Sequence, residues 1–489
     1  MKNNSKTLST KSALIYAIGI FGVQLFIGYM NNFQTEFYNK MYSGFDKNIF
    51  YASAIIIFAA KVISCIFDPI IGALIDKSNL KGGKMRPWIL RSAFPIAILT
   101  TVIFIYIPFD SFGAYGKIML YAYITVTTVL WNIAMSFADI PSQGMLSLLS
   151  PDVDERNTAA SFSNIAKSIA LATPGVFVTV VMFMLDAIKG KGAYPDKEYY
   201  LVTAMTLLVL GTVCYLLIYF FNRETVTSTS SAANVSIKEM FEELKTNKMI
   251  LIVFLIYILG FARTMSVIIC VQANGALVGK VNLLGMTMDT TSDATWLPGL
   301  LGAISGMLGI CFVPAINKKF GEKKTYIAFS VLTFVYTMLC CIFYWLIPAE
   351  SPLRYGNPAL YFIMATQFIC AFLLSANTYI PLVMTADIVD YQLYKTGKRK
   401  EGVNFAILSM AIKLSNAMCV AGGLLIIAVS GYSQVVYETG IIPVKMQNTV
   451  MFAYTGCVGI SALLSAIPMF FYKIDEKTKE EMRSAIKNG

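Results

Sequence analysis

The stretch that decides the fold is KVISCIFDPIIGALIDKSNLKGGKMRPW, residues 61–88. It begins as an apolar run that contains one carboxylate, Asp68, followed directly by Pro69, and it ends in a glycine-rich basic turn. An apolar run that stops at lysines and arginines is typical of a helix that leaves a bilayer. The stretch therefore predicts the end of a membrane-spanning helix that carries a carboxylate within the span.

The composition extends this prediction to the whole chain. Of the 489 residues, 56% are hydrophobic and 14% are charged, whereas about a quarter of a soluble domain is charged. The nine cysteines lie in apolar segments without metal-ligand spacing, so we expect buried thiols, no structural metal and no cofactor. Histidine is absent, so any proton or cation chemistry must use carboxylates.

Segments long enough to span a bilayer, about 20 apolar residues each, recur along the chain. We count twelve, at 13–38, 49–75, 88–108, 116–149, 159–187, 199–222, 249–274, 296–316, 325–348, 358–389, 403–430 and 449–473. The predicted fold class is an all-α polytopic membrane protein with twelve transmembrane helices.

The basic residues orient these helices. Twelve spans place both termini on one side, and 25 of the 39 lysines and arginines fall in the terminal segments and loops of that side. The positive-inside rule makes that side cytoplasmic. The net charge of +11 therefore reflects topology in a lipid bilayer, and no nucleic-acid partner is expected.

One long polar interruption, residues 223–248, divides the chain into two halves of six helices, 1–222 and 249–489. Ser236 followed by Glu239 predicts a capping box that opens a short amphipathic helix. Its apolar side would consist of Ile237, Met240, Phe241 and Leu244. We interpret this cytoplasmic helix as a surface connection between the halves rather than as a regulatory docking site.

The two halves contain similar basic turns at corresponding places. GALIDKSNLKGGKMRP (72–87) follows the second segment, and PAINKKFGEKK (314–324) is a shorter basic turn after the eighth. Such internal repeats are typical of transporters that work by alternating access, with a site near mid-membrane. The first turn resembles the one that recurs in the major facilitator superfamily, through Gly72, Asp76, Gly83 and Lys84.

Charged side chains within spans usually mark a transport pathway, because each is costly to bury in lipid. The predicted spans contain Lys61, Asp68, Arg91, Asp139, Lys167, Arg263 and Lys413. Arg91 is close enough to the cytoplasmic end to reach the surface, so we interpret it as structural.

Two of these charges lie on polar stripes in the first half. Lys61, Ser64 and Asp68 share one helix face at i, i+3 and i+7, and Ser136 precedes Asp139 by three residues. Carboxylates with hydroxyls are a possible oxygen site for Na⁺, or one carboxylate could carry a proton. The alternative is structural: each aspartate pairs with a basic residue.

A third stripe lies in the second half. Ser409, Lys413 and Asn416 are spaced i, i+4 and i+7 in the eleventh segment. Lysine can bind sugar hydroxyls or anionic groups, and the alternative is a hydrogen-bonded seam between helices. Stripes in both halves favour a central cavity.

Residues 385–417, TADIVDYQLYKTGKRKEGVNFAILSMAIKLSNA, identify a family. With DPIIG and GKMRPWIL at 68–90 and ADIP and DER at 138–156, they resemble the glycoside-pentoside-hexuronide:cation symporters, which include melibiose permease. The resemblance covers nearly the whole chain. It implies uptake of a glycoside or sugar acid together with Na⁺, H⁺ or Li⁺ across a bacterial cytoplasmic (inner) membrane, without an enzymatic step.

The resemblance also assigns roles to single positions. Asp68 matches a coupling carboxylate, Asp139 a sugar-binding aspartate, and Lys413 the lysine that links the sugar and cation sites. Lys61 keeps the charge of a position usually held by arginine, and Ser136 stands where a cation-ligating threonine occurs. We expect a small-molecule substrate to contact Arg263 as well.

This chain departs from the family at four positions. Ser64 replaces the second coupling aspartate, Ile20 a sugar-binding aspartate, Gln143 an aromatic residue that stacks on sugar, and Asn164 an arginine. These departures put a galactoside-type pocket and a two-carboxylate Na⁺ site in doubt. A facilitator or sensor that has lost cation coupling is therefore the alternative function.

The cytoplasmic motifs predict a gate. We expect charge pairs between the halves to stabilise the outward-facing state of a monomer. The residues concerned are Asp76, Arg156, Asp387, Asp390, Arg399 and Glu401.

The charge balance within the spans suggests a substrate class. Without Arg91, four cations (Lys61, Lys167, Arg263 and Lys413) oppose Asp68 and Asp139, which leaves a surplus of positive charge. A uronide or a sulfonated sugar would relieve that surplus.

Overall fold

A computed structural model describes most of the chain in two compact units. The described residues are 9–77, 80, 82–150, 153–190, 196–224, 237–283, 286–290, 296–396, 401–432, 442–474, 478 and 481. Helices dominate both units.

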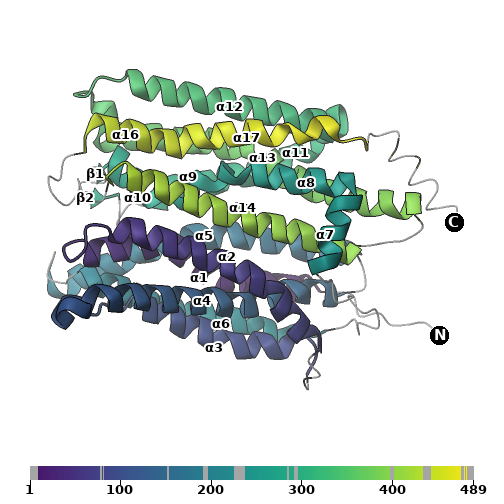
Figure 1. Ribbon diagram of the computed structural model, residues 1–489, viewed down its shortest axis with the longest axis horizontal. Helices are drawn as coiled ribbons and strands as arrows, with labels where there is room; N and C mark the ends of the chain where they lie inside the picture. Colours follow the sequence, from purple (N-terminus) through teal and green to yellow (C-terminus); the bar gives the residue numbers. More distant parts are fainter. Residues whose placement is uncertain are drawn as a thin grey trace. The chain divides into compact units, whose positions relative to one another are not determined.

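The first unit, residues 1–231 with 288–296, is built from six long helices that pack side by side (Figure 1). They are α1 (Thr10–Tyr42), α2 (Ile49–Lys77), α3 (Arg86–Ile103), α4 (Gly116–Leu148), α5 (Val153–Lys189) and α6 (Asp196–Phe221), with a 3₁₀ turn η1 (Phe109–Tyr115) before α4. A Cβ on Gly22 of α1 would lie 2.5 Å from the carbonyl oxygen of Gly211 on α6. Only glycine lets these two backbones approach so closely.

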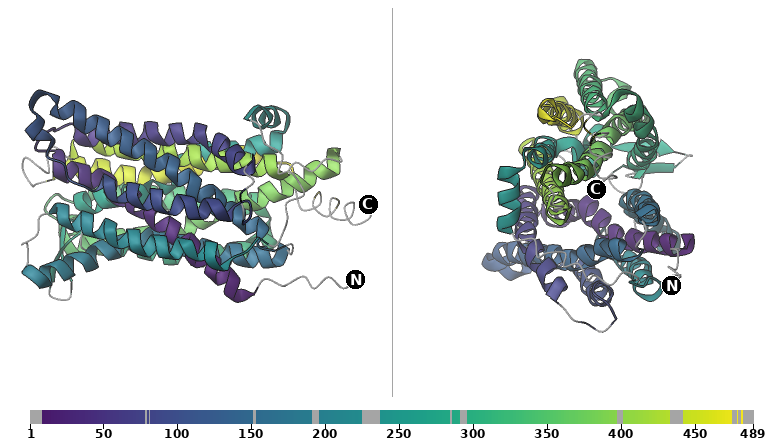
Figure 2. Two further views of the ribbon diagram at one scale, coloured as in Figure 1. Left: turned by 90° about the horizontal axis from the view of Figure 1, so that it is seen from below. Right: turned by 90° about the vertical axis from the view of Figure 1, so that its right-hand side faces the viewer.

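The second unit, residues 232–287 with 297–489, contains shorter helical pieces as well as long helices (Figure 2). The long helices are α11 (Trp296–Phe320), α12 (Glu322–Leu346), α13 (Gly356–Thr396) and α14 (Glu401–Val429). The shorter pieces are α7 (Ile237–Thr246), α8 (Lys248–Leu259), η2 (Phe261–Thr264), α9 (Met265–Ile268), α10 (Cys270–Leu277), η3 (Pro352–Arg354), α16 (Val444–Met451), η4 (Phe452–Gly456), α17 (Cys457–Ala466) and η5 (Pro468–Phe471). Two four-residue strands, β1 (Lys280–Leu283) and β2 (Met286–Asp289), form the described sheet.

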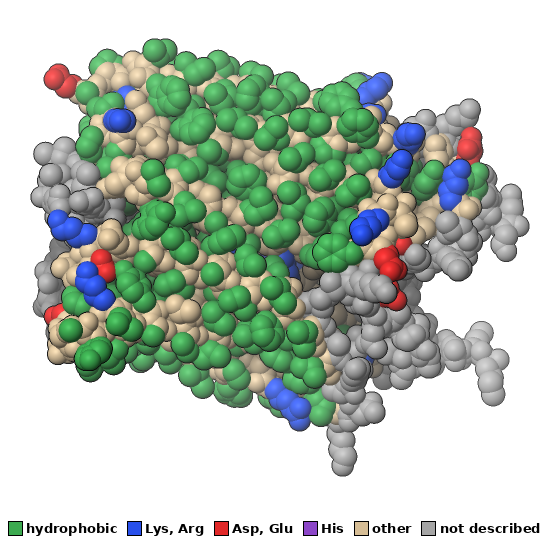
Figure 3. All heavy atoms as spheres, viewed as in Figure 1, with side chains coloured by type: hydrophobic (Ala, Val, Ile, Leu, Met, Phe, Trp, Pro, Cys, Tyr) green, Lys and Arg blue, Asp and Glu red, His purple; other side chains and the backbone are tan. Residues whose placement is uncertain are grey.

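Each of the twelve predicted segments falls on helix. Nine described helices are long and apolar enough to cross a membrane, and two bent helix pairs raise the number to eleven. The remaining segment corresponds to α3, which has 18 residues and begins at Arg86. Figure 3 shows hydrophobic side chains over the middle of the helices and lysines and arginines near their ends, as expected for helices that contact lipid.

The seventh predicted segment is not one continuous helix. A bend of 49° separates Lys248–Leu259 from Phe261–Ile268, so the prediction of a single helix over 249–274 is wrong at Gly260. Ser461 of α17 bonds both sides of the break: its Oγ accepts from the amide of Ala262 and donates to the carbonyl of Leu259, each at 3.0 Å. Because this hydroxyl satisfies freed backbone groups, the bend is stable within an apolar bundle.

The linker helix α7 belongs to the second unit, where it packs against α8 and α14. Met240 and Leu244 are buried as predicted, whereas Phe241 is 54% exposed, so its assignment to the buried side is wrong. Glu243 is buried and accepts hydrogen bonds from Gln392 of α13 at 2.7 Å and from Asn247 at 3.0 Å. This carboxylate fixes α7 to its unit. Ser236 of the predicted capping box lies outside the described residues.

Candidate substrate and cation site

The polar stripes of α2 and α4 meet at two serines. The Oγ atoms of Ser64 and Ser136 lie 3.1 Å apart, and both hydroxyls approach the carbonyl oxygen of Asn132, at 3.5 and 3.2 Å. The structure therefore brings together two side chains that are 72 residues apart in the sequence. The contact provides two hydroxyl oxygens and one carbonyl oxygen in one place.

Asp68 lies one helical turn beyond Ser64 on the same face of α2 and is half-buried. The neighbouring residues Ile66, Phe67 and Ile70 are exposed, so the apolar and polar faces of this helix are separated. A carboxylate one helical turn from hydroxyl and carbonyl oxygens offers the hard donors that an alkali cation prefers, and a carboxylate is equally able to carry a proton. Among the described residues, no cluster of three or more His, Cys, Asp or Glu side chains could hold a resident metal ion.

Asp139 lies farther along α4 and is bound by Gln143. Its Oδ2 accepts a hydrogen bond of 2.8 Å from Gln143 Nε2, one turn away on the same helix. Tyr16 of α1 and Tyr215 of α6 donate to the carbonyls of Ser142 and Ala138, each at 3.0 Å, and so hold the backbone around Pro141. A carboxylate paired with an amide offers acceptors and donors together, which suits the hydroxyl groups of a sugar.

Lys61 is half-buried and reaches α1. Its Nζ donates to Asn31 Oδ1 at 3.4 Å. Asn31 was not among the predicted site residues, although it opens a polar run in α1 with Asn32, Gln34, Thr35 and Glu36. The contact adds an amide to the polar face that α1, α2 and α4 share.

A second group of polar residues was also missed. Thr128 and Asn132 precede Ser136 on α4 at intervals of four residues, and both are buried. Gln34 of α1 donates to Thr128 Oγ1 at 2.9 Å, and Asn132 donates to the Thr128 carbonyl at 2.8 Å. The four-residue period was the available signal, because it continues the stripe of Ser136 toward the N-terminus of the helix.

Two further carboxylates change the charge balance. Glu36, which is only 4% exposed, lies within α1, and Asp387 is half-buried within α13; both fall in predicted spans. The count of four cations against Asp68 and Asp139 omitted them. Lys117, Asp186 and Lys473 also stand within the predicted bounds, so six cations face five carboxylates when Arg91 is set aside. The surplus of two falls to one, and the anionic substrate stays a prediction.

The predicted stripe of the second unit lies on α14. Lys413 is half-buried, whereas Ser409 and Asn416 are exposed. Exposed polar side chains in the middle of an apolar helix are costly against lipid. This face of α14 is therefore suited to a water-filled pathway.

Arg263 lies in η2, directly after the break in the seventh segment. Its Nη1 donates to the carbonyl of Asn377 on α13 at 3.0 Å, and its guanidinium carbon lies 4.1 Å from the ring centroid of Tyr257. These contacts with the protein hold the bent segment against α13. Its predicted contact with substrate stays a prediction.

The other predicted residues are placed only in part. Asn164 is exposed on α5, and its carbonyl accepts from Ser168. Asp76, Arg156, Asp390 and Glu401 lie on α2, α5, α13 and α14, but the structure does not describe their side chains, and Arg399 lies outside the described residues. The gate stays a prediction.

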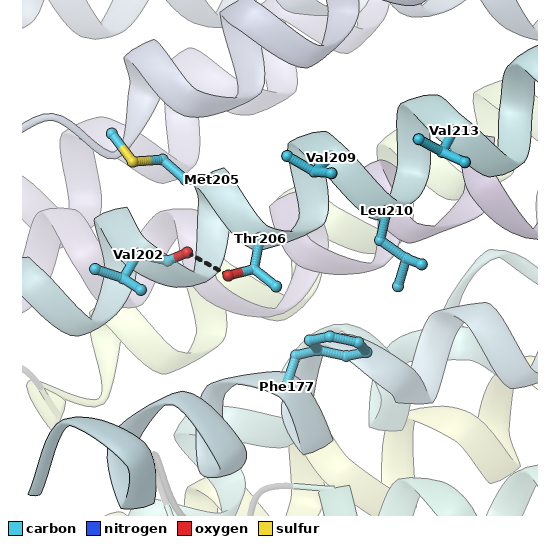
Figure 4. Close-up of a pocket in the computed structure, with 7 residues that line it drawn as sticks. All are labelled: Phe177, Val202, Met205, Thr206, Val209, Leu210 and Val213. Carbon is cyan, nitrogen blue, oxygen red and sulfur yellow. Dashed lines mark hydrogen bonds between the residues drawn. The ribbon is translucent and has the colours of Figure 1, made fainter. Parts of the chain in front are cut away.

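An apolar groove between α5 and α6 is separate from these polar residues (Figure 4). It is lined by Phe177, Val202, Met205, Thr206, Val209, Leu210 and Val213. The hydroxyl of Thr206 donates to the Val202 carbonyl of its own helix. Because the groove has no charged side chain and its lining residues Met205, Val209 and Val213 are exposed, it suits a lipid chain rather than a sugar.

Comparisons with known proteins agree with the sequence resemblance. The family model described as MFS/sugar transport protein matches residues 15–476. A protein of Bacillus subtilis (strain 168) named uncharacterized symporter YnaJ is 22% identical over 100% of this chain and 97% of its own length. The isoprimeverose transporter of Lactiplantibacillus pentosus is 24% identical over 85% of this chain and 80% of its own length.

A solved structure supports the fold. The crystal structure of a D-xylose-proton symporter superposes with a TM-score of 0.64 at 13% identity, and the match covers 96% of this chain and 99% of that one. Together with the family match, it confirms a major facilitator fold and a transporter rather than an enzyme.

Proposed function

The chain belongs to the MFS/sugar transport protein family, and from this premise we propose that it imports a glycoside by symport with Na⁺ or H⁺. The observation that carries the proposal is the contact of Ser64 with Ser136, one turn from Asp68. A relative named as a symporter and one named as an isoprimeverose transporter support sugar symport in general.

The proposed cation site consists of Asp68, Ser64 and Ser136, with Asp139 farther along α4. Asp68 supplies the charge, and the two hydroxyls and the Asn132 carbonyl supply neutral oxygens. Lys61 remains nearby on α2 as a counter-charge. At this site Asp68 stands where the family has two carboxylates. One carboxylate balances one positive charge, so we expect the site to take a single proton or a single alkali ion.

We propose a neutral glycoside as the substrate. Asp139 with Gln143 in the first unit, and Lys413 with Ser409 and Asn416 in the second, offer donors and acceptors to sugar hydroxyls. Within the predicted spans six cations face five carboxylates when Arg91 is set aside, a surplus too small to require a uronide or a sulfonated sugar. Asn164 and Arg263 are the remaining candidate contacts.

The transporter is proposed to lie in a bacterial cytoplasmic membrane as a monomer, with both termini inside. The basic turn at 82–86 and the linker then face the cytoplasm. Asp387, Asp390 and Glu401 are proposed gate residues on that side.

The proposal is tested by uptake into proteoliposomes. A neutral disaccharide such as isoprimeverose and an anionic methyl glucuronide are compared, each with an imposed Na⁺ or H⁺ gradient. We expect one gradient to accelerate uptake of the neutral sugar, and Asp68→Asn to reduce this acceleration by at least about tenfold because the coupling charge is lost. The affinity for sugar, measured by thermal shift, should change little.

Asp110→Asn is the matched control, because Asp110 is exposed in η1 and lies outside the site. Coupling that persists in Asp68→Asn would contradict the cation site. Uptake by the wild type that responds to neither gradient would favour the uncoupled facilitator, and preference for the glucuronide would contradict the neutral substrate.

A further inference from the structure

The carboxylate of Glu224 binds the basic turn that precedes α3. Its Oε2 accepts from the amide of Lys84 at 2.8 Å, and its Oε1 accepts from the amides of Met85 at 2.7 Å and Arg86 at 3.1 Å. Glu224 lies just beyond the end of α6, about 140 residues from these amides in the sequence. Consecutive backbone amides at a helix N-terminus form an anion-binding site, and here a side chain of the same chain fills it.

A reciprocal interaction runs from α3 to α6. Arg86 donates to the carbonyl of Tyr219, from Nε at 3.1 Å and from Nη2 at 2.6 Å, and its guanidinium lies 5.1 Å from the Tyr219 ring centroid. Tyr219 belongs to the last turn of α6, where carbonyls lack partners within the helix. A negative group thus caps the N-terminus of α3 and a positive group caps the C-terminus of α6, which matches the sign of both helix dipoles.

Gly83 makes room for this carboxylate. Both Gly82 and Gly83 have positive φ, at 108° and 122°. A Cβ on Gly83 would lie 2.5 Å from Oε1 of Glu224, whereas a Cβ on Gly82 would meet nothing within 4 Å. The two glycines therefore share a backbone requirement, but only Gly83 must lack a side chain for Glu224 to bind.

The end of α6 is also tied to α1. Asn222 is 1% exposed and donates from Nδ2 to the Ser12 carbonyl at 3.0 Å. The three residues that follow α6, 222–224, thus contact the starts of both α1 and α3. The predicted linker to the second half begins directly afterwards.

We propose that Glu224 is a positioning residue of the transport cycle, which locks the 82–86 turn so that this end of the first half moves as one rigid piece. The role rests on the proposed function, because alternating access requires each half to reorient as a unit. Glu224 does not contact the candidate substrate residues. Its loss should therefore slow reorientation and leave sugar affinity unchanged.

The first test needs no substrate. In the empty full-length protein, hydrogen exchange is measured at the amides of residues 84–86. We expect Glu224→Gln to accelerate exchange by at least about tenfold, because charge-assisted hydrogen bonds are lost. Gly83→Ala should have a similar effect and Gly82→Ala a smaller one. Glu350→Gln, at an exposed glutamate, is the control.

The second test separates positioning from general stability. In the isoprimeverose uptake assay, or with the neutral sugar that the wild type transports best, Glu224→Gln should lower Vmax by about tenfold with little change in KM. Glu224→Asp, which keeps the charge, should restore part of the rate. In a Glu224→Ala background, Gly82→Ala and Gly83→Ala should become equivalent, because the side chain that a Cβ at position 83 would meet is gone.

Exchange at 84–86 that is unchanged in Glu224→Gln would overturn the lock. Faster exchange with wild-type Vmax would overturn the positioning role. If the wild type transports no sugar, the proposed function fails, while the exchange measurements still decide whether Glu224 locks the turn.

Discussion

The basic turns of the two halves use the same physical device with different residues. In the first half, Arg86 at the start of α3 caps the carbonyl of Tyr219 near the end of α6. In the second, Lys323 at the start of α12 donates to the carbonyls of Phe470 at 2.8 Å and Tyr472 at 3.4 Å, at the end of the last helix. In each half, a cation from the third helix neutralises the negative end of the sixth.

The difference between the turns lies in what else each one binds. The first turn has two glycines with positive φ and receives the carboxylate of Glu224 at Gly83. The second has one such glycine, Gly321 with φ 79°, and a Cβ there would meet nothing within 4 Å. The two turns are therefore similar because each supplies a cation that caps a neighbouring helix. The first turn has an additional glycine because it also binds the carboxylate of Glu224.

Among the substitutions that test this comparison, Arg86→Ala should have the largest effect on stability. The change removes two hydrogen bonds and a contact with the Tyr219 ring, so we expect the free energy of unfolding to fall by about 2–4 kcal/mol. Unfolding is measured in detergent. Arg91→Ala is the control, because Arg91 is exposed on the same helix and lies over Trp88 at 5.8 Å. Equal effects of the two changes would contradict the capping role of Arg86.

Lys323→Ala should have a smaller effect of the same kind. Lysine offers a point charge without the planar fork of arginine, so we expect a loss of about 1 kcal/mol. The same unfolding measurement applies, with the exposed neighbour Lys324→Ala as the control. A loss as large as that of Arg86→Ala would mean that the two caps are equivalent, and no loss would mean that only the first half depends on its cap.

The smallest effect should appear at the opposite end of the first unit, where Asp46 is held mainly by side chains. Burial alone would raise the pKa of Asp46, but hydrogen bonds from Tyr121 and the amide of Asn48, together with Lys117 at 3.4 Å, lower it below its ordinary value. A lowered folded-state pKa contributes stability above the unfolded value of about 3.9, and this contribution is lost as the pH falls through the folded-state pKa.

Asp46→Asn should therefore destabilise the protein at pH 7, and the difference from the wild type should shrink in acid. The measurement is the thermal unfolding midpoint at pH 7 and below about pH 4. Asp110→Asn, at an exposed site, serves as the control. A difference that grows on acidification would mean that the pKa of Asp46 is raised rather than lowered.

Much of the fold was predictable because the signals are local. Twelve apolar segments were counted from their length, and each falls on helix. The break at Gly260 was not predictable, because its stability depends on Ser461, about 200 residues away in the sequence. The burial of Glu243 on α7 was missed for the same reason, because its partner Gln392 lies on α13.

The candidate site was predicted in part. The stripes of α2 and α4 follow from helical spacing, which places Ser64, Asp68, Ser136 and Asp139 on polar faces. Asn31 and Gln34 were missed although they stand at i and i+3 in a polar run of α1, because no sequence spacing shows that this run faces α2 and α4. Glu36 was left out of the charge count although it stands in a predicted span.

The sequence by itself determined that the chain spans a membrane in two halves of six helices and that it belongs to a family of sugar transporters. These properties depend on the length of apolar segments and on short motifs, which are local. Only the tertiary structure decided which polar groups meet: Ser64 with Ser136, Lys61 with Asn31, and Glu224 with the amides beside Gly83. Hydrogen bonds between distant segments depend on helix rotation and on the closeness of backbones, and packing of the whole unit sets both.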